Sequence, residues 1–123
     1  MNDKIKDFYD LDAWKKAHKI VLEIYNTTKK FPKEELYGIT SQLRRAASSV
    51  TANIAEGFSR YHYNDKIRFY LNARGSISEV KNFLFLSKDL EYLKEEKFKE
   101  IFNASEDVSK LINGLIRSIE KQK

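Results

Sequence analysis

Residues 64–90 read NDKIRFYLNARGSISEVKNFLFLSKDL, and this segment decides the fold. Its apolar side chains recur every three or four positions, which is the period of an α-helix. The main apolar face of the helix is formed by Phe69, Ala73, Ile77, Val80, Phe83 and Leu84. Such a helix needs other elements to cover that face.

Three further helices are predicted on the same grounds, over about residues 11–30, 34–58 and 94–121. The chain has only four glycines and one proline, which favours long helices with short connections. We therefore predict an all-α fold in which residues 1–123 form one up-down-up-down four-helix bundle.

The expected helix ends rest on a few capping and breaking residues. Asp10 and Asn64 are the expected N-caps of the first and third helices. Pro32 marks the break before the second helix, and Gly38 interrupts its first turns. The helix is expected to end near Gly57 or within a turn after it.

The helix at 64–90 also has a second apolar side. Ile67, Leu71 and Phe85 project roughly 140° from its main face when residues are spaced about 100° apart around the axis. A helix that is apolar on two sides is usually buried on two sides. We predict that these residues contact another copy of the chain in a homo-oligomer. The alternative is that the connection between the first two helices covers this side.

The chain contains no cysteine, which excludes disulfides, thiolate metal sites and a cysteine nucleophile. His18 and His62 are far apart in sequence, and no zinc motif or glycine-rich phosphate loop is present. No metal or other cofactor is therefore expected. The N-terminus has no secretory signal, and no apolar run approaches the ~20 residues of a membrane span. A cytoplasmic protein with no membrane partner is expected.

The net charge is +5, and the excess lies in the middle of the chain. Residues 41–88 have eight Lys and Arg against three Asp and Glu. Such an excess favours a polyanionic partner, and arginine suits bidentate contacts to phosphate. The side chains expected to contact nucleic acid are Lys15, Lys16, Lys19, Arg44, Arg60 and Lys66. The alternative is a solvated basic face with internal ion pairs.

Polar residues at helical spacing run beside the apolar stripes of the second and third helices. If they face one another, they form a polar seam in which Gly75 and Ser76 allow close approach of the backbones. The polar seam consists of Gln42, Arg45, Asn53, Glu56, Arg68, Gly75, Ser76 and Glu79. Two interpretations stay open: a half-buried network that fixes the helix register, or the anion site of a small helical enzyme. The lack of a second carboxylate pair or of a nucleophile with its base argues against the enzyme.

The segment Phe58-Ser59-Arg60-Tyr61-His62-Tyr63-Asn64 joins the second and third helices and interleaves aromatic rings with a cation. Rings in such a setting can stack unpaired bases of single-stranded or looped RNA. The alternative is that Phe58 and one tyrosine cap the end of the bundle.

Several strings of the sequence resemble a known family. The most specific lie between Phe31 and Gly57: Phe31-Pro32-Lys33-Glu34-Glu35-Leu36-Tyr37-Gly38, Ser41-Gln42-Leu43-Arg44-Arg45-Ala46 and Asn53-Ile54-Ala55-Glu56-Gly57. Further on come Phe69-Tyr70-Leu71 and Ala73-Arg74-Gly75-Ser76. From about Phe8 to the last helix, the chain resembles the four-helix bundle family of bacterial 23S rRNA intervening-sequence proteins.

The resemblance implies a bundle that assembles into a ring, typically a homopentamer. A related branch, the accessory variability protein of diversity-generating retroelements, is basic and associates with nucleic acid and a reverse transcriptase. The resemblance supplies no catalytic residue. The positions that match the polar motif of the family are Gln42, Arg45, Asn53, Glu56, Gly75, Ser76 and Glu79.

The expected function is that of a non-enzymatic homo-oligomeric bundle that binds RNA, or acts as a nucleic-acid accessory protein, through basic surface residues. Its expected partners are other copies of the chain and RNA or another nucleic acid, with no small-molecule substrate. The alternative is a protein-interaction scaffold that does not bind nucleic acid.

Overall fold

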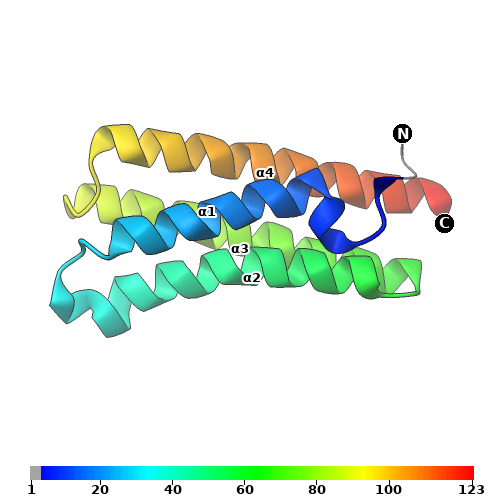
Figure 1. Ribbon diagram of the computed structural model, residues 1–123, viewed down its shortest axis with the longest axis horizontal. Helices are drawn as coiled ribbons and strands as arrows, with labels where there is room; N and C mark the ends of the chain where they lie inside the picture. Colours follow the sequence, from blue (N-terminus) through cyan, green and yellow to red (C-terminus); the bar gives the residue numbers. More distant parts are fainter. Residues whose placement is uncertain (1–3) are drawn as a thin grey trace.

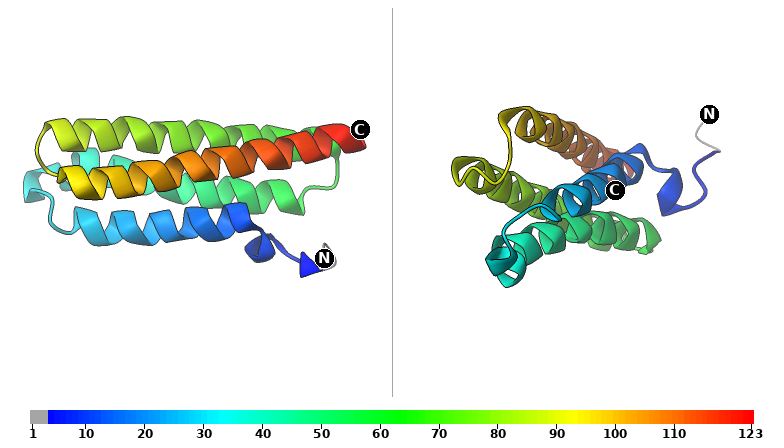
Figure 2. Two further views of the ribbon diagram at one scale, coloured as in Figure 1. Left: turned by 90° about the horizontal axis from the view of Figure 1, so that it is seen from above. Right: turned by 60° about the vertical axis from the view of Figure 1, so that its left-hand side comes forward.

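The computed structural model describes residues 4–123, which form four long α-helices (Figure 1). These are α1 (Asp12–Thr28), α2 (Ser41–Ser59), α3 (Tyr63–Asp89) and α4 (Glu95–Gln122), and no strand occurs among the described residues. Successive helices run antiparallel and pack side by side, and α4 also packs against α1 (Figure 2). The predicted all-α four-helix bundle is therefore confirmed.

One apolar stripe from each helix forms the core of the bundle. Its fully buried members include Ile24, Leu43, Ile54, Ile77, Leu84 and Ile112. Burial of a side chain of this size stabilises the fold by roughly 1.5–3 kcal/mol. Within the described residues, no helix combines the length and the apolar character needed to cross a bilayer.

The stripe of α3 differs from its prediction at one position. Tyr70 is buried in the core, whereas Phe69 is only partly buried and lies beside two arginine side chains. Adjacent residues of a helix are about 100° apart, so Phe69 and Tyr70 lie on opposite edges of the apolar stripe, and the sequence pattern allows either ring to be the buried one. Burial raises the pKa of the Tyr70 phenol to about 12.

The predicted N-caps of the first and third helices are wrong. Asp10 belongs to a short 3-10 helix, Phe8–Asp10, where its carboxylate accepts the backbone N–H groups of Lys6 (2.9 Å) and Asp7 (3.0 Å). These hydrogen bonds lower the pKa of Asp10. The N-cap of α1 is Leu11, and that of α3 is His62 instead of Asn64.

The connection from α1 to α2 is a 3-10 turn, Lys33–Glu35, followed by a π-helical turn, Leu36–Thr40. Gly38 has non-helical dihedral angles (φ −107°, ψ −117°), so the second helix is kinked where its sequence predicted an interruption. The Tyr92 hydroxyl donates to Oε2 of Glu35 (2.9 Å) and links this connection to the one between α3 and α4. This hydrogen bond raises the pKa of Tyr92.

As predicted, α2 ends within a turn after Gly57, and this glycine packs against Tyr70 of α3. A Cβ atom on Gly57 would lie 2.7 Å from Cε1 of that ring. The predicted close approach at Gly75 is wrong, because a Cβ atom there would have no atom within 4 Å. The close approach of α2 and α3 therefore depends on Gly57.

The second apolar side of α3 is largely uncovered in a single chain. Leu71 is 41% exposed and Phe85 is 45% exposed, while Ile67 is partly buried. One side of the Phe85 ring packs against Phe98 and Phe102 of α4, with ring centroids 5.0 and 5.3 Å away. The connection between α1 and α2 does not cover this side, so that alternative is wrong.

Candidate nucleic-acid interface

The fold separates charge along the length of the bundle. The start of α1, the connection between α2 and α3, and the end of α4 meet at one end (Figure 1). We divide each helix at its middle residue and call this half, residues 4–20, 50–76 and 109–123, the basic half. It has 13 Lys and Arg against six Asp and Glu, a net charge of +7. The other half, residues 21–49 and 77–108, has ten Lys and Arg against eleven Asp and Glu, a net charge of −1.

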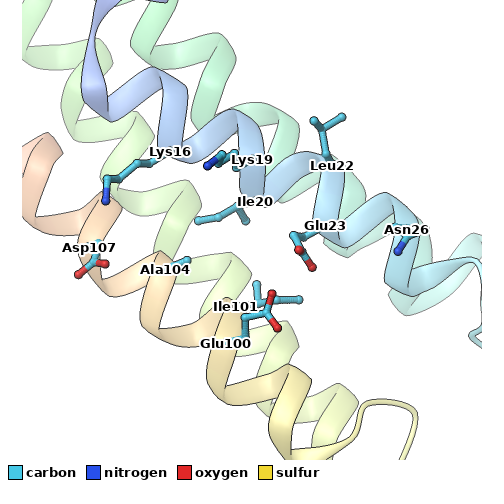
Figure 3. A pocket seen from close by; sticks show the side chains of 10 residues that line it. All are labelled: Lys16, Lys19, Ile20, Leu22, Glu23, Asn26, Glu100, Ile101, Ala104 and Asp107. Carbon is cyan, nitrogen blue, oxygen red and sulfur yellow. The ribbon is translucent and has the colours of Figure 1, made fainter.

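Three of the predicted contact residues lie on α1 in the basic half. Lys15, Lys16 and Lys19 are exposed, and none forms an ion pair within residues 4–123. Lys16 and Lys19 stand on the rim of a groove between α1 and α4 (Figure 3). These three ammonium groups are available to phosphates.

Arg44 lies in the other half, where it joins α1 to α2. Its Nε donates to Oγ1 of Thr28 (2.9 Å), and its guanidinium lies over the ring of Tyr25, 4.8 Å from the centroid. The side chain is thus partly buried and engaged. The structure does not place it with the other predicted contact residues.

Lys66 lies in the basic half but is also engaged. Its Nζ donates to the carbonyl oxygens of Phe58 (2.8 Å) and Gly57 (3.5 Å), which lie in the last turn of α2. Burial lowers the pKa of this lysine. Lys66 therefore caps a helix, and its amine is less available to phosphates than those of the three lysines on α1.

Arg60 and Arg68 lie close together on the surface of the basic half. Their guanidinium carbons lie 4.6 and 4.5 Å from the centroid of the Phe69 ring. Arg60 pairs with Glu56 at 2.7 Å, and its buried Nε has no hydrogen-bond partner in residues 4–123. Arg68 pairs with Asp65 only at 3.7 Å, and its side chain is 58% exposed. The looser pairing leaves Arg68 the more available of the two.

The connection between α2 and α3 presents aromatic rings next to these cations. Tyr61 is 88% exposed, and its ring meets that of His62 edge to face at 5.1 Å. Tyr63 borders a shallow depression of about 530 Å³ that Lys123 of α4 also lines. Phe58 is partly buried, and Lys66 lies over its ring at 5.5 Å. Phe58 therefore packs at the end of the bundle, while both tyrosines remain exposed.

The polar seam is a surface feature made of separate groups. Arg45 forms an ion pair with Glu79 of α3 and also donates to the side-chain oxygen of Gln42. The Arg45 side chain is 56% exposed and that of Glu79 is 37% exposed. Below them, the hydroxyl groups of Ser49 and Ser76 hydrogen-bond at 2.8 Å.

Asn53 extends the Ser49–Ser76 pair within α2. Its side-chain amide donates to the carbonyl oxygen of Ser49 (2.8 Å) and to the Ser49 hydroxyl (3.1 Å). Glu56 forms its ion pair with Arg60, and Arg68 forms its ion pair with Asp65. Neither of the two cavities described here is lined by a residue of the seam.

The groove between α1 and α4 has a volume of about 560 Å³ and was not predicted from the sequence. Ile20, Ile101 and Ala104 form its floor, and Figure 3 shows charged side chains from both helices around it. At one end Lys97 bridges Glu23 (3.3 Å) and Glu100 (3.2 Å), and these hydrogen bonds raise the pKa of Lys97. No group of three or more His, Asp or Glu side chains suited to a metal ion occurs in residues 4–123.

Fold and charge together define a class: a short-looped antiparallel four-helix bundle with one strongly basic half. The family model described as 23S rRNA-intervening sequence protein matches residues 9–114. The chain belongs to this family, which confirms the resemblance read from the sequence.

A solved structure supports the same assignment. It is a protein of unknown function from the S23 ribosomal protein family of Bacteroides thetaiotaomicron. The two chains share 25% sequence identity with a TM-score of 0.79, over 85% of this chain and 97% of the other. A comparison with curated proteins found no match.

Proposed function

We propose that the protein is a homo-oligomer that binds RNA through its basic half, without catalysing a reaction. The observation that carries this proposal is the charge of +7 gathered in one half of a chain whose other half is close to neutral. Lys and Arg side chains bind a nucleic acid by displacing counterions from its phosphates. RNA is also in keeping with the family name, and a cytoplasmic location forms part of the same proposal.

The outer face of α3 supports the homo-oligomer. Between the exposed side chains of Leu71 and Phe85, this face has Gly75, Ser78 and Asn82, and none of these carries a charge. Depletion of charge is typical of the centre of a protein interface. We propose this strip as the subunit contact, and the family resemblance points to a ring of five.

The groove between α1 and α4 supports a second candidate, a scaffold that binds a protein partner. An apolar floor with a charged rim suits an amphipathic segment of another protein. The scaffold alone would assemble without measurable affinity for RNA. Binding to RNA therefore separates the two candidates.

The test measures the affinity for a structured bacterial RNA at 50 and 200 mM salt by fluorescence anisotropy. We expect binding that weakens steeply with salt. The triple variant Lys15→Gln, Lys16→Gln, Lys19→Gln should lower the slope of log K against log salt by about 2–3, since each phosphate contact contributes roughly 0.7–0.9. The matched control replaces Lys29, Lys30 and Lys33, three exposed lysines of the other half. No binding by the wild type at low salt would end the proposal.

A further inference from the structure

We propose that the connection between α2 and α3 is a stacking site for an unpaired RNA base, with the ring of Tyr61 as its platform. This inference rests on the proposed RNA binding and names the kind of RNA that is bound. It assigns a preference for single-stranded or looped segments over continuous duplex.

The exposure of Tyr61 is the first step of the argument. The ring is 88% exposed although it belongs to a connection of only three residues, 60–62. Its one aromatic neighbour among the described residues is the edge-on ring of His62, so most of its surface faces solvent. Every base has a π-face, and an exposed aromatic ring can stack on it regardless of sequence.

The connection is held in place on both sides of Tyr61. Its two flanking residues have extended backbone angles, Arg60 at φ −74°, ψ 148° and His62 at φ −82°, ψ 140°. On one side, the Arg60 guanidinium is fixed by Glu56 and by the ring of Phe69. On the other, Lys66 is bound to the last carbonyls of α2. Since the residues around Tyr61 are already held in place, binding loses little backbone conformational entropy.

Cations lie near the residues that flank Tyr61 in the chain, where they can contact phosphates. Arg68 is more than half exposed and is only loosely paired with Asp65. Lys123 lies across the shallow depression that begins at His62 and Tyr63. Asp65 also borders this depression, and Lys123 forms an ion pair with Glu120 at 3.4 Å. An aromatic platform beside a cationic surface is the combination that binds single strands.

Duplex RNA cannot use this site in the same way. Its bases are stacked inside the helix, and its deep, narrow major groove keeps side chains away from them. A duplex therefore gains only the phosphate contacts of the basic half. A single strand or a loop gains the same contacts together with stacking on Tyr61.

The experiment compares Tyr61→Ala with the wild type by fluorescence anisotropy on four labelled probes. These are a ten-nucleotide single-stranded RNA, a hairpin with a loop, a duplex without a loop, and single-stranded DNA of the same sequence. Stacking on one base is worth about 1–3 kcal/mol, so we expect the single-strand and hairpin affinities to fall about 5- to 140-fold. Duplex affinity and the salt slope should not change, because no charge is removed.

Two further variants keep the result interpretable. Tyr61→Phe retains the ring and should bind like the wild type. Tyr37→Ala removes a ring that is 90% exposed in the other half, and should also bind like the wild type. Unchanged single-strand affinity in Tyr61→Ala would overturn the stacking site, and tighter binding of DNA would overturn the assignment to RNA. If the wild type bound none of the probes at low salt, the proposed function itself would fail.

Discussion

The ring of Tyr70 occupies the space that a side chain on Gly57 would need. A Cβ atom at position 57 would lie 2.7 and 2.8 Å from two ring carbons of Tyr70, and 3.3 Å from the carbonyl oxygen of Lys66. The contact joins α2 to α3 directly beneath the connection that carries Tyr61. It therefore sets the spacing of the two helices that form the proposed stacking site.

Gly57→Ala should destabilise the protein. Overpacking of a core costs about 1–3 kcal/mol, which exceeds the roughly 1 kcal/mol that alanine gains over glycine in a helix. Gly75→Ala is the matched control, because open space surrounds that position in α3. The control should stabilise the protein by up to about 1 kcal/mol. Urea unfolding measures both, and a stability change of the same sign in the two variants would contradict the packing described here.

Tyr70→Phe should make the protein less sensitive to alkaline pH. The folded pKa of about 12 lies above the unfolded value near 10, so the folded state keeps a proton that the unfolded state loses. The contribution of the phenol is present in full below pH 10 and is lost as the pH rises towards 12. At pH 11 the wild type should have lost about 1.4 kcal/mol more than the variant, relative to pH 8. Parallel stability curves for the two proteins would show that the phenol is not buried in solution.

Lys66→Met should weaken the fold without changing the electrostatics of RNA binding. The substitution removes the donor that caps the end of α2, which we expect to cost about 1 kcal/mol of stability. The slope of RNA affinity against salt should stay that of the wild type, unlike in the triple lysine variant of α1. A drop in this slope by 0.7 or more, the amount of one phosphate contact, would return Lys66 to the RNA interface.

Leu71→Asp should break the proposed oligomer into monomers. The side chain is 41% exposed in the single chain and lies on the uncharged strip of α3, where a buried carboxylate would be strongly unfavourable. Phe85 is less suitable for this test, because it also packs against α4. Leu22→Asp, at an exposed position on α1, is the control and should keep the mass of the wild type. Light scattering measures the mass, and an intact assembly in Leu71→Asp would place the subunit contact elsewhere.

The sequence predicted the features that repeat along a helix. The apolar stripes gave all four helices, and Gly38 was placed correctly as an interruption of the second. Residues whose role depends on another helix were harder to predict. Gly57 serves the packing of Tyr70, and Lys66 caps α2 from α3, which spacing within one helix does not reveal.

The candidate site was predicted only in part for the same reason. The run from Arg60 to Tyr63 indicated aromatic rings beside a cation. It did not show which rings stay exposed, and the fold partly buries Phe58 but leaves Tyr61 and Tyr63 at the surface. The charge excess was assigned to residues 41–88, whereas the fold gathers it from three separate segments at one end. Arg44, a predicted contact residue, lies in the other half, whereas Lys123, which was not predicted, lies in the basic half.

The uneven charge along the bundle has a consequence for an assembly of several copies. In a closed ring whose axis runs parallel to the helices, cyclic symmetry points every subunit the same way. All basic halves would then form one strongly positive rim, and the opposite rim would be almost neutral. Such a ring has two different sides, so a polyanion would dock on one side and leave the other open to a second kind of partner.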